Sequence, residues 1–376
     1  MNNPYTNRGT IKNPYEFYGR EREIRRIFSR ISSSHPQCIS VIGERKIGKS
    51  SLLYYLNHES IRKKWLKDPD SYIFLLIDLQ ERTFDISFTN LFQYIFRYLK
   101  KELGDRLAME FPSDTENHSE QYEAFRQVIS KIVGYGLKLI IMFDEFGMIT
   151  TNESFDSNFF SFLRSIANNY DCAYITTSRM KLQELCHDTD ISESPFFNIF
   201  TPVPLSQFSH DEARSLIFMP SKGTDVEFSE RDADFIISNA GYHPLFIQIA
   251  CSSLFDHRVH NSDAKNVDYE IVKKDFLVEA TGHFENIWKE TNEAKQEILC
   301  KAALGEGVTS QEQYLVKELQ RSGYLTEDRA KPFSQSFQEF LLSKRPGAAP
   351  EKTDDGLGRR NSFSEFIKDL FSRKDR

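Results

Sequence analysis

The chain has 376 residues and a formal net charge of −7, and 39% of its residues are hydrophobic. This length exceeds one ordinary hydrophobic core, so two or three packed units are expected. The negative charge offers no overall attraction to nucleic acid. No stretch approaches the roughly 18 apolar residues of a membrane span, and the polar first residues differ from a signal peptide. Five scattered cysteines without a C-x-x-C pair argue against structural zinc and disulfides and predict a cytoplasmic location.

Between residues 38 and 205, apolar runs typical of β-strands alternate with segments of helical periodicity. The expected strands are Cys38–Ile42, Tyr72–Asp78, Leu137–Phe143, Ala173–Thr177 and Ile199–Val203. The expected helices between them are Ser50–Asn57, Phe88–Leu103, Gln121–Val133 and Phe155–Asn168. Strand–helix alternation with nearly continuous apolar strands predicts an α/β fold, in which helices cover both faces of a parallel sheet.

Beyond Leu205 the strand pattern stops and a different organisation is expected. Ser209 and Ser229 each stand three residues before an acidic residue, which predicts two capped helix starts in a helical unit over 206–291. Residues 292–345 predict two short helices followed by a β-hairpin near 323–334, which is the outline of a winged helix. The predicted domains are therefore residues 1–205, 206–291 and 292–345, followed by a tail over 346–376.

The tail combines a linker rich in Gly, Pro and charge with a short segment, 361–376, of helical periodicity. Apolar side chains recur on one face of that segment: Phe363, Phe366, Ile367, Leu370 and Phe371. Three interpretations stay open, namely docking on the chain's own core, binding in a partner's groove, and binding to a membrane surface. The third rests on six basic against three acidic groups in residues 359–376. The flexible linker favours a tethered contact with a partner protein.

The stretch "GERKIGKS", Gly43 to Ser50, follows the first expected strand and precedes a helix. It fills every fixed position of the phosphate-binding pattern G-x-x-x-x-G-K-[ST]. Gly43 and Gly48 let the backbone N–H groups converge on phosphates. Lys49 is expected to reach the β- and γ-phosphates, Ser50 to offer a hydroxyl to Mg²⁺, and Ser51 to touch the α-phosphate. The predicted nucleotide contacts also include the residues between the two glycines: Glu44, Arg45, Lys46 and Ile47.

Two further strands are expected to end in residues suited to phosphate chemistry. One apolar strand leads into Asp144 and Glu145, at the carboxyl end where ligands bind in such sheets. Asp144 is expected to hold the Mg²⁺ shell, and Glu145 to orient or deprotonate the attacking water. Another strand leads into Arg179, whose guanidinium is expected to report on the γ-phosphate. Lys49, Glu145 and Arg179 are thus the predicted catalytic residues.

Taken in order, these stretches resemble the STAND branch of the AAA+-related P-loop ATPases, particularly its bacterial and archaeal members. The resemblance covers about residues 14–345. The stretch "FYGREREI" is similar to the family's G-R-x-x-E segment, which approaches the adenine. The resemblance therefore implies nucleotide contacts for Gly19, Arg20 and Glu23.

The stretch "AGYHPLFIQ", residues 240–248, is similar to the family's G-x-P motif, which lies in a helical lid. The resemblance implies that Gly241 and Pro244 lie against the base or ribose and that His243 comes near the phosphates. It also places a winged helix after the lid, where residues 292–345 show that outline.

The resemblance implies an ATP- and ADP-binding switch with slow, Mg²⁺-dependent ATP hydrolysis. Its nucleotide state would control homo-oligomerisation and a partner effector. Many relatives act in bacterial antiviral defence or stress signalling, which is an expectation from the resemblance. The sequence departs from larger members, because neither an N-terminal effector domain nor a repeat array is visible in it. An effector in trans, contacted through residues 361–376, is therefore expected to supply the output.

A DNA-binding ATPase that joins the same core to a winged helix, as the origin-recognition proteins do, is the alternative. A surface that grips phosphates should be basic, whereas residues 293–345 hold eight Lys or Arg and eight Asp or Glu. The candidate recognition helix, Gln311–Arg321, is balanced in the same way, so DNA binding is not favoured. A plain kinase or GTPase is less favoured still, because no N-K-x-D guanine-reading motif is present.

Overall fold

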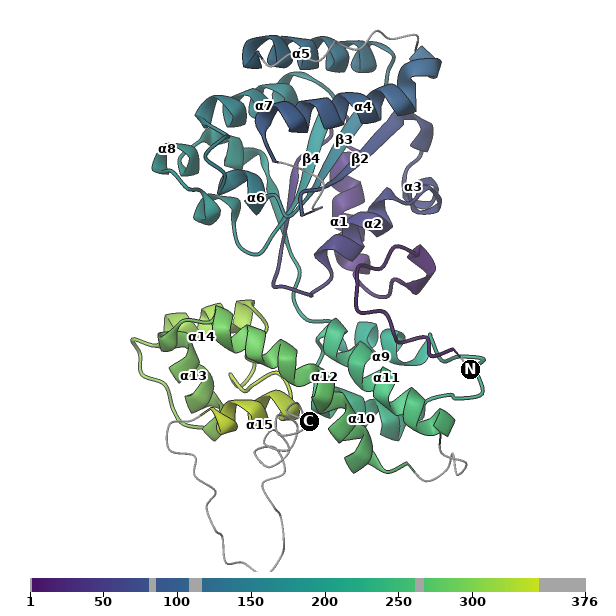
Figure 1. Cartoon of the computed structure of the whole chain (residues 1–376), viewed down its shortest axis with the longest axis vertical. Coiled ribbons are helices and arrows are strands. Elements are labelled where there is room, and N and C mark those ends of the chain that lie inside the picture. Colours follow the sequence, from purple (N-terminus) through teal and green to yellow (C-terminus); the bar gives the residue numbers. More distant parts are fainter. Residues whose placement is uncertain (1, 81–85, 108–116, 261–266, 345–376) are drawn as a thin grey trace, which may run out of the picture. The chain divides into compact units, whose positions relative to one another are not determined.

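The computed structural model describes residues 2–80, 86–107, 117–260 and 267–344. The predicted linker and amphipathic helix over 346–376 lie outside these residues. The chain forms two compact units (Figure 1). The sheet unit is Thr10–Leu205, and the helical unit joins residues 2–9 to residues 206–344. The expected first domain began at Met1, whereas residues 2–9 pack with the helical unit.

Among the described residues of the sheet unit, five parallel strands form one sheet in the order β2-β3-β4-β1-β5. The strands are β1 (Ile39–Ile42), β2 (Tyr72–Asp78), β3 (Lys138–Asp144), β4 (Cys172–Ser178) and β5 (Thr201–Pro204). Ile42 of β1 pairs with Ser178 on one side and with Pro204 on the other. β4 therefore separates β1 from β3, and the carboxyl ends of all three strands lie at the same edge.

The helices of the sheet unit lie on both sides of these strands. They are α1 (Glu21–Ile31), α2 (Lys49–Asn57), α3 (Glu59–Trp65), α4 (Phe88–Leu107), α5 (His118–Gly134), α6 (Gly147–Thr150), α7 (Ser157–Asn169) and α8 (Thr189–Ser192). Short 3-10 helices are η1 (Pro14–Glu16), η2 (Pro69–Ser71), η3 (Leu182–Leu185) and η4 (Pro195–Ile199).

Right-handed crossovers explain which helices share a face of the sheet. After β1 the chain crosses in one direction to β2, and after β2 it returns in the other direction, so the connecting helices fall on opposite faces. In Figure 1, α4, α5 and α7 accordingly lie on one side of the strands, and α2 lies on the other. The segment of β3 from Leu139 to Phe143 is at most 1% exposed. The predicted α/β fold with a parallel sheet covered on both faces is confirmed.

The first four strands begin and end within one residue of the predicted positions. The fifth was expected at Ile199–Val203 but begins at Thr201, two residues later. Pro195 occupies the first turn of η4, which extends to Ile199. A proline at this position favours a helix start because its missing N–H would have no intrahelical partner there.

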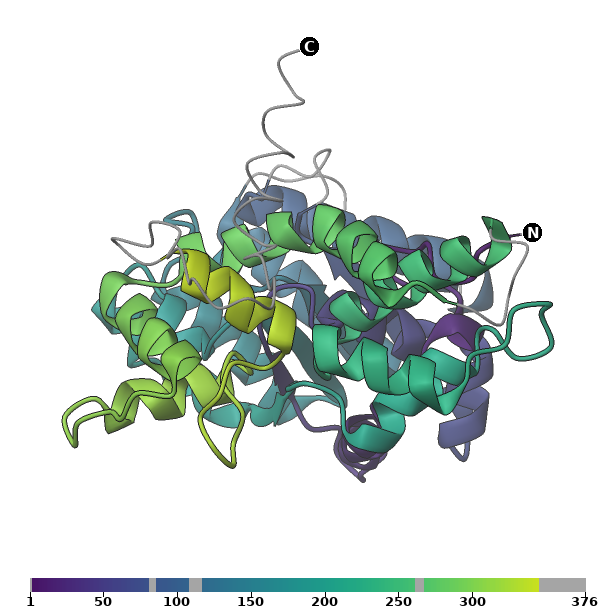
Figure 2. The same ribbon diagram turned by 90° about the horizontal axis from the view of Figure 1, so that it is seen from below.

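The helical unit has two adjoining groups of helices, which are coloured green and yellow-green in Figure 2. They are α9 (His210–Phe218), α10 (Glu230–Ala240), α11 (Pro244–His260), α12 (Tyr269–Glu290), α13 (Glu293–Leu304), α14 (Gln313–Arg321) and α15 (Gln335–Ser343). The predicted capping box at Ser209 is present, and the predicted helix start at Ser229 has a capping box as well. In the part of the chain that the structure describes, no helix has the length and hydropathy needed to cross a membrane.

A short antiparallel connection between α14 and α15 completes the winged-helix outline. Leu325 bridges Pro332, and the Thr326 N–H donates to the carbonyl oxygen of Lys331 at 2.7 Å. This connection is the predicted hairpin, reduced to a single bridge. The lid helices and the winged helix follow the sheet in the predicted order.

Candidate nucleotide-binding site

The loop between β1 and α2 carries the phosphate-binding pattern, and its conformation depends on its glycines. Gly43 has no room for a side chain, because an added Cβ would lie 2.8 Å from the carbonyl oxygen of Leu205 and 2.9 Å from Cγ2 of Ile47. Gly48 has a φ of 108°, a conformation that glycine adopts without steric cost, and Lys46 also has a positive φ of 65°. The loop is thereby curled into the compact shape expected of a phosphate cradle.

The helix after the loop presents its N-terminal end without a side-chain cap. Gly48 is the N-cap residue of α2 and offers no side chain to the first N–H groups. Such N–H groups, together with the positive end of the helix dipole, attract anions. Ser50 and Ser51 lie in this first turn, and the Ser51 hydroxyl accepts a hydrogen bond from the Ile11 N–H at 3.0 Å. The turn therefore combines backbone donors and hydroxyls where a phosphate would bind.

Lys49 connects the phosphate loop to the carboxylates at the end of β3. Its side chain is 5% exposed, and its Nζ lies 3.6 Å from the Glu145 carboxylate and donates to the Gly43 carbonyl oxygen at 2.9 Å. Burial lowers the pKa of Lys49 from its ordinary value; the carboxylates of Glu145 and Asp144 act in the opposite direction, and Arg179 adds to the lowering. The structure thus brings Glu145, Asp144 and Arg179 within electrostatic range of Lys49.

Thr177 in β4 holds both carboxylate residues, and the sequence reasoning did not single it out. Its buried hydroxyl donates to Oδ1 of Asp144 at 2.6 Å and accepts from the Glu145 N–H at 2.7 Å. Its carbonyl oxygen accepts from the Phe146 N–H at 2.9 Å. Glu145 has a φ of 56°, so these bonds stabilise a backbone conformation that is uncommon for a residue with a side chain. The hydroxyl residues at the end of this apolar strand are visible in the sequence, but the sequence alone does not place the strand beside β3.

Substituting Thr177→Val is expected to slow ATP hydrolysis by roughly ten- to a hundredfold. Valine keeps the shape but leaves a buried oxygen of the Asp144 carboxylate and the Glu145 N–H without this partner, at a cost of about 1–3 kcal/mol. Thr177→Ser restores the hydroxyl and should recover most of the rate. The neighbouring substitution Thr176→Val, also in the buried part of β4, is the matched control. Measured kcat and KM that are unchanged in Thr177→Val would contradict the positioning role.

Arg20 reaches the phosphate loop rather than standing apart from it. Gly19 and Arg20 have positive φ angles of 76° and 65° just before α1. The Arg20 side chain is buried, and its guanidinium donates to the carbonyl oxygen of Ile47 at 3.0 Å. Glu23 is half-buried in the first turn of α1. The arginine of the G-R-x-x-E segment therefore hydrogen-bonds to the backbone of the phosphate loop and helps to hold the loop in place.

Gly241, His243 and Pro244 belong to the helical unit, whereas the phosphate loop belongs to the sheet unit. They occupy the turn from α10 into α11. Gly241 has a φ of 63°, and an added Cβ would lie 2.3 Å from the carbonyl oxygen of Phe333. The His243 ring is 7% exposed and lies near Phe246, with centroids 4.9 Å apart. Within the helical unit, this motif is one of the places where the lid helices meet the winged helix.

Ser50 and Asp144 supply the hard oxygen atoms that Mg²⁺ prefers. Asp144 is 4% exposed and lies at the carboxyl end of β3. An ionised carboxylate has about four lone-pair positions, so the bond from Thr177 leaves capacity for a cation. The donor set therefore fits a magnesium ion bound together with nucleotide phosphates.

Comparisons with known proteins agree with this fold. The model of a family described as Novel STAND NTPase 2 matches residues 33–308. No curated protein sequence matches the chain significantly. A Walker-type ATPase of Pyrococcus abyssi has a similar structure, with a TM-score of 0.60, 16% identity and coverage of 90% of this chain and 99% of that chain. The ORC2 protein of Aeropyrum pernix, in its ADP form, gives a TM-score of 0.56 at 10% identity, over 90% of this chain and 87% of that chain.

At these identities the two structures show a shared fold and no more. The family match has a different weight, because it extends over most of the chain and includes the phosphate loop, both carboxylates and the lid motif. The protein therefore belongs to the second family of novel STAND NTPases, a group of P-loop ATPases.

Proposed function

We propose that this protein is an ATP- and ADP-binding switch that resets by slow ATP hydrolysis. One observation carries the proposal, namely that the lid motif is interlocked with the winged helix. The carbonyl oxygen of Phe333 fills the space beside Gly241, and the Phe333 ring stacks on Phe246 of α11 with centroids 5.5 Å apart. A change imposed by a nucleotide at His243 or Pro244 would therefore be passed to the winged helix. A switch requires such coupling between the bound nucleotide and a second domain, whereas the reaction of a simple metabolic kinase does not.

In this proposal the sheet unit performs the phosphate chemistry. Lys49 and the N-terminus of α2 bind the β- and γ-phosphates. Ser50 and Asp144 hold Mg²⁺, which would neutralise phosphate charge when bound. Glu145 accepts the proton of the attacking water, and Arg179 contacts the γ-phosphate.

The position of Glu145 supports slow turnover. Its carboxylate lies 3.6 Å from the Lys49 ammonium, so the base faces the lysine of the phosphate loop before a water molecule reaches it. Thr177 fixes the backbone of Glu145, so the side chain must exchange its lysine partner for a water molecule by rotating. We therefore expect a turnover well below the enzyme median of about 10 per second.

The charges on the winged helix favour binding to a protein partner over binding to DNA. Lys295 and Lys301 of α13 pair with Glu318 and Glu312, at 3.0 Å and 2.6 Å. Lysines engaged in such pairs contribute less to binding a phosphate backbone, which depends on releasing counterions. We propose that the nucleotide state controls self-association and, through it, a partner effector in trans.

Light scattering with ADP and with a non-hydrolysable ATP analogue tests this function. The purified protein is expected to bind both nucleotides and to form a larger assembly with the ATP analogue. Equal masses in the two states would contradict nucleotide control of assembly. Failure to bind adenine nucleotides in equilibrium dialysis would contradict the whole proposal. A DNA gel shift that weakens steeply with salt would instead support the DNA-binding alternative.

A further inference from the structure

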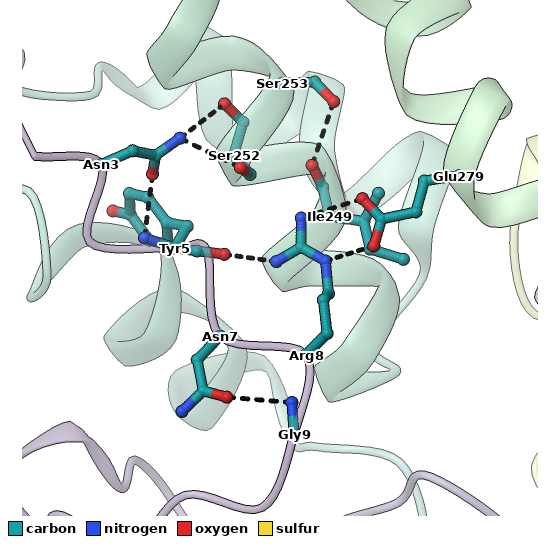
Figure 3. A network of polar contacts seen from close by, with 9 residues as sticks. All are labelled: Asn3, Tyr5, Asn7, Arg8, Gly9, Ile249, Ser252, Ser253 and Glu279. Atoms are coloured by element: carbon teal, nitrogen blue, oxygen red, sulfur yellow. Dashed lines mark hydrogen bonds and ion pairs between the residues drawn. The ribbon is translucent and has the colours of Figure 1, made fainter.

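The beginning of the described chain is fastened to the helical unit by side chains that the sequence reasoning left unassigned (Figure 3). The Tyr5 ring is 1% exposed and stacks on Phe228, with centroids 5.4 Å apart. Its hydroxyl donates to the carbonyl oxygen of Ile217. The Asn3 amide donates to the carbonyl oxygen of Ser252 at 3.1 Å. A buried aromatic ring with a satisfied hydroxyl is a specific anchor, unlike the loose packing of a trailing end.

Arg8 adds a second anchor three residues later. Its Nε and Nη2 atoms donate to the two carboxylate oxygens of Glu279 in α12, the latter at 3.0 Å. Its Nη1 donates to the carbonyl oxygen of Tyr5, which ties the two anchors together. Bidentate arginine–carboxylate pairs fix geometry as well as adding energy. Figure 3 shows Asn3 bonded to Ser252 of α11 and Arg8 bonded to Glu279 of α12.

The residues that follow belong to the sheet unit and contact the helix of the phosphate loop. The Ile11 N–H donates to the Ser51 hydroxyl at 3.0 Å, and the Lys12 ammonium lies 5.2 Å from the centroid of the Tyr54 ring. Ser51 and Tyr54 are both in α2. Only two residues separate Arg8, on the helical unit, from Ile11, on α2.

The other connection between the two units also begins at the phosphate loop. Leu205 is the last residue of the sheet unit. Its N–H donates to the carbonyl oxygen of Ile42 at 2.7 Å, and its own carbonyl oxygen closes the space beside Gly43. One connection is therefore held at the start of the phosphate loop, and the other is held at Ser51, just after it.

We propose that residues 3–11, which we call the strap, act as a second tether that couples the helical unit to the phosphate loop and slows nucleotide release. This inference rests on the proposed nucleotide switch and extends it to a part of the chain outside the predicted site. The Ser51 hydroxyl accepts the strap's N–H and keeps its own proton to donate to a phosphate oxygen. Moving the strap therefore disturbs a group expected to touch the nucleotide.

The strap is short, so it limits how far its two attachment points can move apart. Three Cα–Cα steps join Arg8 to Ile11, and they can span at most about 11 Å. Any larger rearrangement of the helical unit must break one of the two attachments. Lengthening the tether removes this restriction without touching either attachment, because effective concentration falls roughly as the −3/2 power of tether length.

The test is a ten-residue Gly/Ser insertion between Gly9 and Thr10. Lengthening the tether from three steps to thirteen lowers the effective concentration that it provides about ninefold. Because the connection at Leu205 stays in place, release of a fluorescent ADP analogue should accelerate severalfold, with about ninefold as the upper limit. The matched control is the same insertion between Lys222 and Gly223, an exposed turn of the helical unit. It should leave the release rate within about twofold of the wild type.

A second pair of variants removes an anchor instead of lengthening the tether. Arg8→Ala should accelerate ADP release and raise amide exchange in residues 3–11. Arg214→Ala removes a comparable bidentate pair, with Glu230, on the surface of the same unit and should change neither.

Small-angle X-ray scattering without nucleotide measures the radius of gyration, which tests the tether independently of ligand binding. The Gly9–Thr10 insertion should give a larger radius of gyration than the control insertion of equal mass. The tether would be refuted if the two insertion variants had equal radii of gyration. It would also be refuted if both variants bound ADP and released it at equal rates. A wild type that binds no ADP while the radii differ would instead refute the nucleotide switch and leave the tether standing.

Discussion

Replacing Lys49 with alanine is expected to remove nucleotide binding at concentrations that saturate the wild type. The side chain is 5% exposed and is the cation that the phosphate loop places beside the Glu145 carboxylate. In the nucleotide complex this ammonium is expected to pair with the phosphates, and truncating one partner of such a buried, hydrogen-bonded charge pair costs about 2–5 kcal/mol, which corresponds to about 30-fold or more in Kd. Isothermal titration with ADP and with a non-hydrolysable ATP analogue measures the loss.

Two further variants separate binding from chemistry. Glu145→Gln keeps the shape of the side chain but removes the base, so nucleotide binding should persist while hydrolysis falls by roughly 10²- to 10⁴-fold. Lys63→Ala, which removes an exposed lysine paired with Glu59 on α3, should change neither quantity. If Lys49→Ala retained the wild-type Kd, the loop between β1 and α2 would not be the phosphate site.

Gly241→Ala is expected to destabilise the helical unit strongly. The backbone at Gly241 has a φ of 63° and a ψ of −150°, a combination that residues with a side chain rarely adopt. Holding alanine there costs about 1–3 kcal/mol. The added methyl would also lie 2.3 Å from the carbonyl oxygen of Phe333, and such overpacking costs about 1–3 kcal/mol more. The lid and the winged helix should therefore lose their tight junction.

The two tryptophans allow this effect to be measured in one unit at a time. Trp65 lies in α3 of the sheet unit, and Trp288 lies in α12 of the helical unit. In a Trp65→Phe background, urea unfolding followed by fluorescence reports on the helical unit alone. Gly282→Ala is the matched control, because an added Cβ there meets nothing within 4 Å and the helix should gain about 0.4–1 kcal/mol. Equal midpoints for the two variants would show that Gly241 is not a required junction.

The elements that carry the candidate phosphate site could be predicted to a large extent because their patterns are local in the sequence. The phosphate loop is one contiguous stretch between a strand and a helix, and its glycines act through their own backbone angles. The two carboxylates could be located from an apolar strand that ends in acidic residues. Contact between Lys49 and Glu145 follows once the sheet is parallel, because the strand ends then meet at one edge.

Thr177 and the strap could not be found in this way. Thr177 acts only because β4 lies beside β3, which brings its hydroxyl to Asp144 from 33 residues along the chain. Tyr5 depends on partners more than 200 residues away, and a tyrosine in a polar stretch carries no periodic pattern that would place it in a core. The bond from the Arg20 guanidinium to the loop carbonyl of Ile47 likewise joins residues 27 positions apart, and no local pattern predicts it.

The amino-acid sequence by itself determined the elements, their order along the chain and the phosphate loop, because hydrophobic periodicity and turn chemistry act over a few residues. The tertiary structure alone decided the strand order β2-β3-β4-β1-β5, the assignment of residues 2–9 to the helical unit, and the fit of Gly241 against Phe333. These features depend on which distant segments become neighbours. Which segments become neighbours depends on how entire faces of helices and of the sheet pack together, and no short stretch of sequence encodes this.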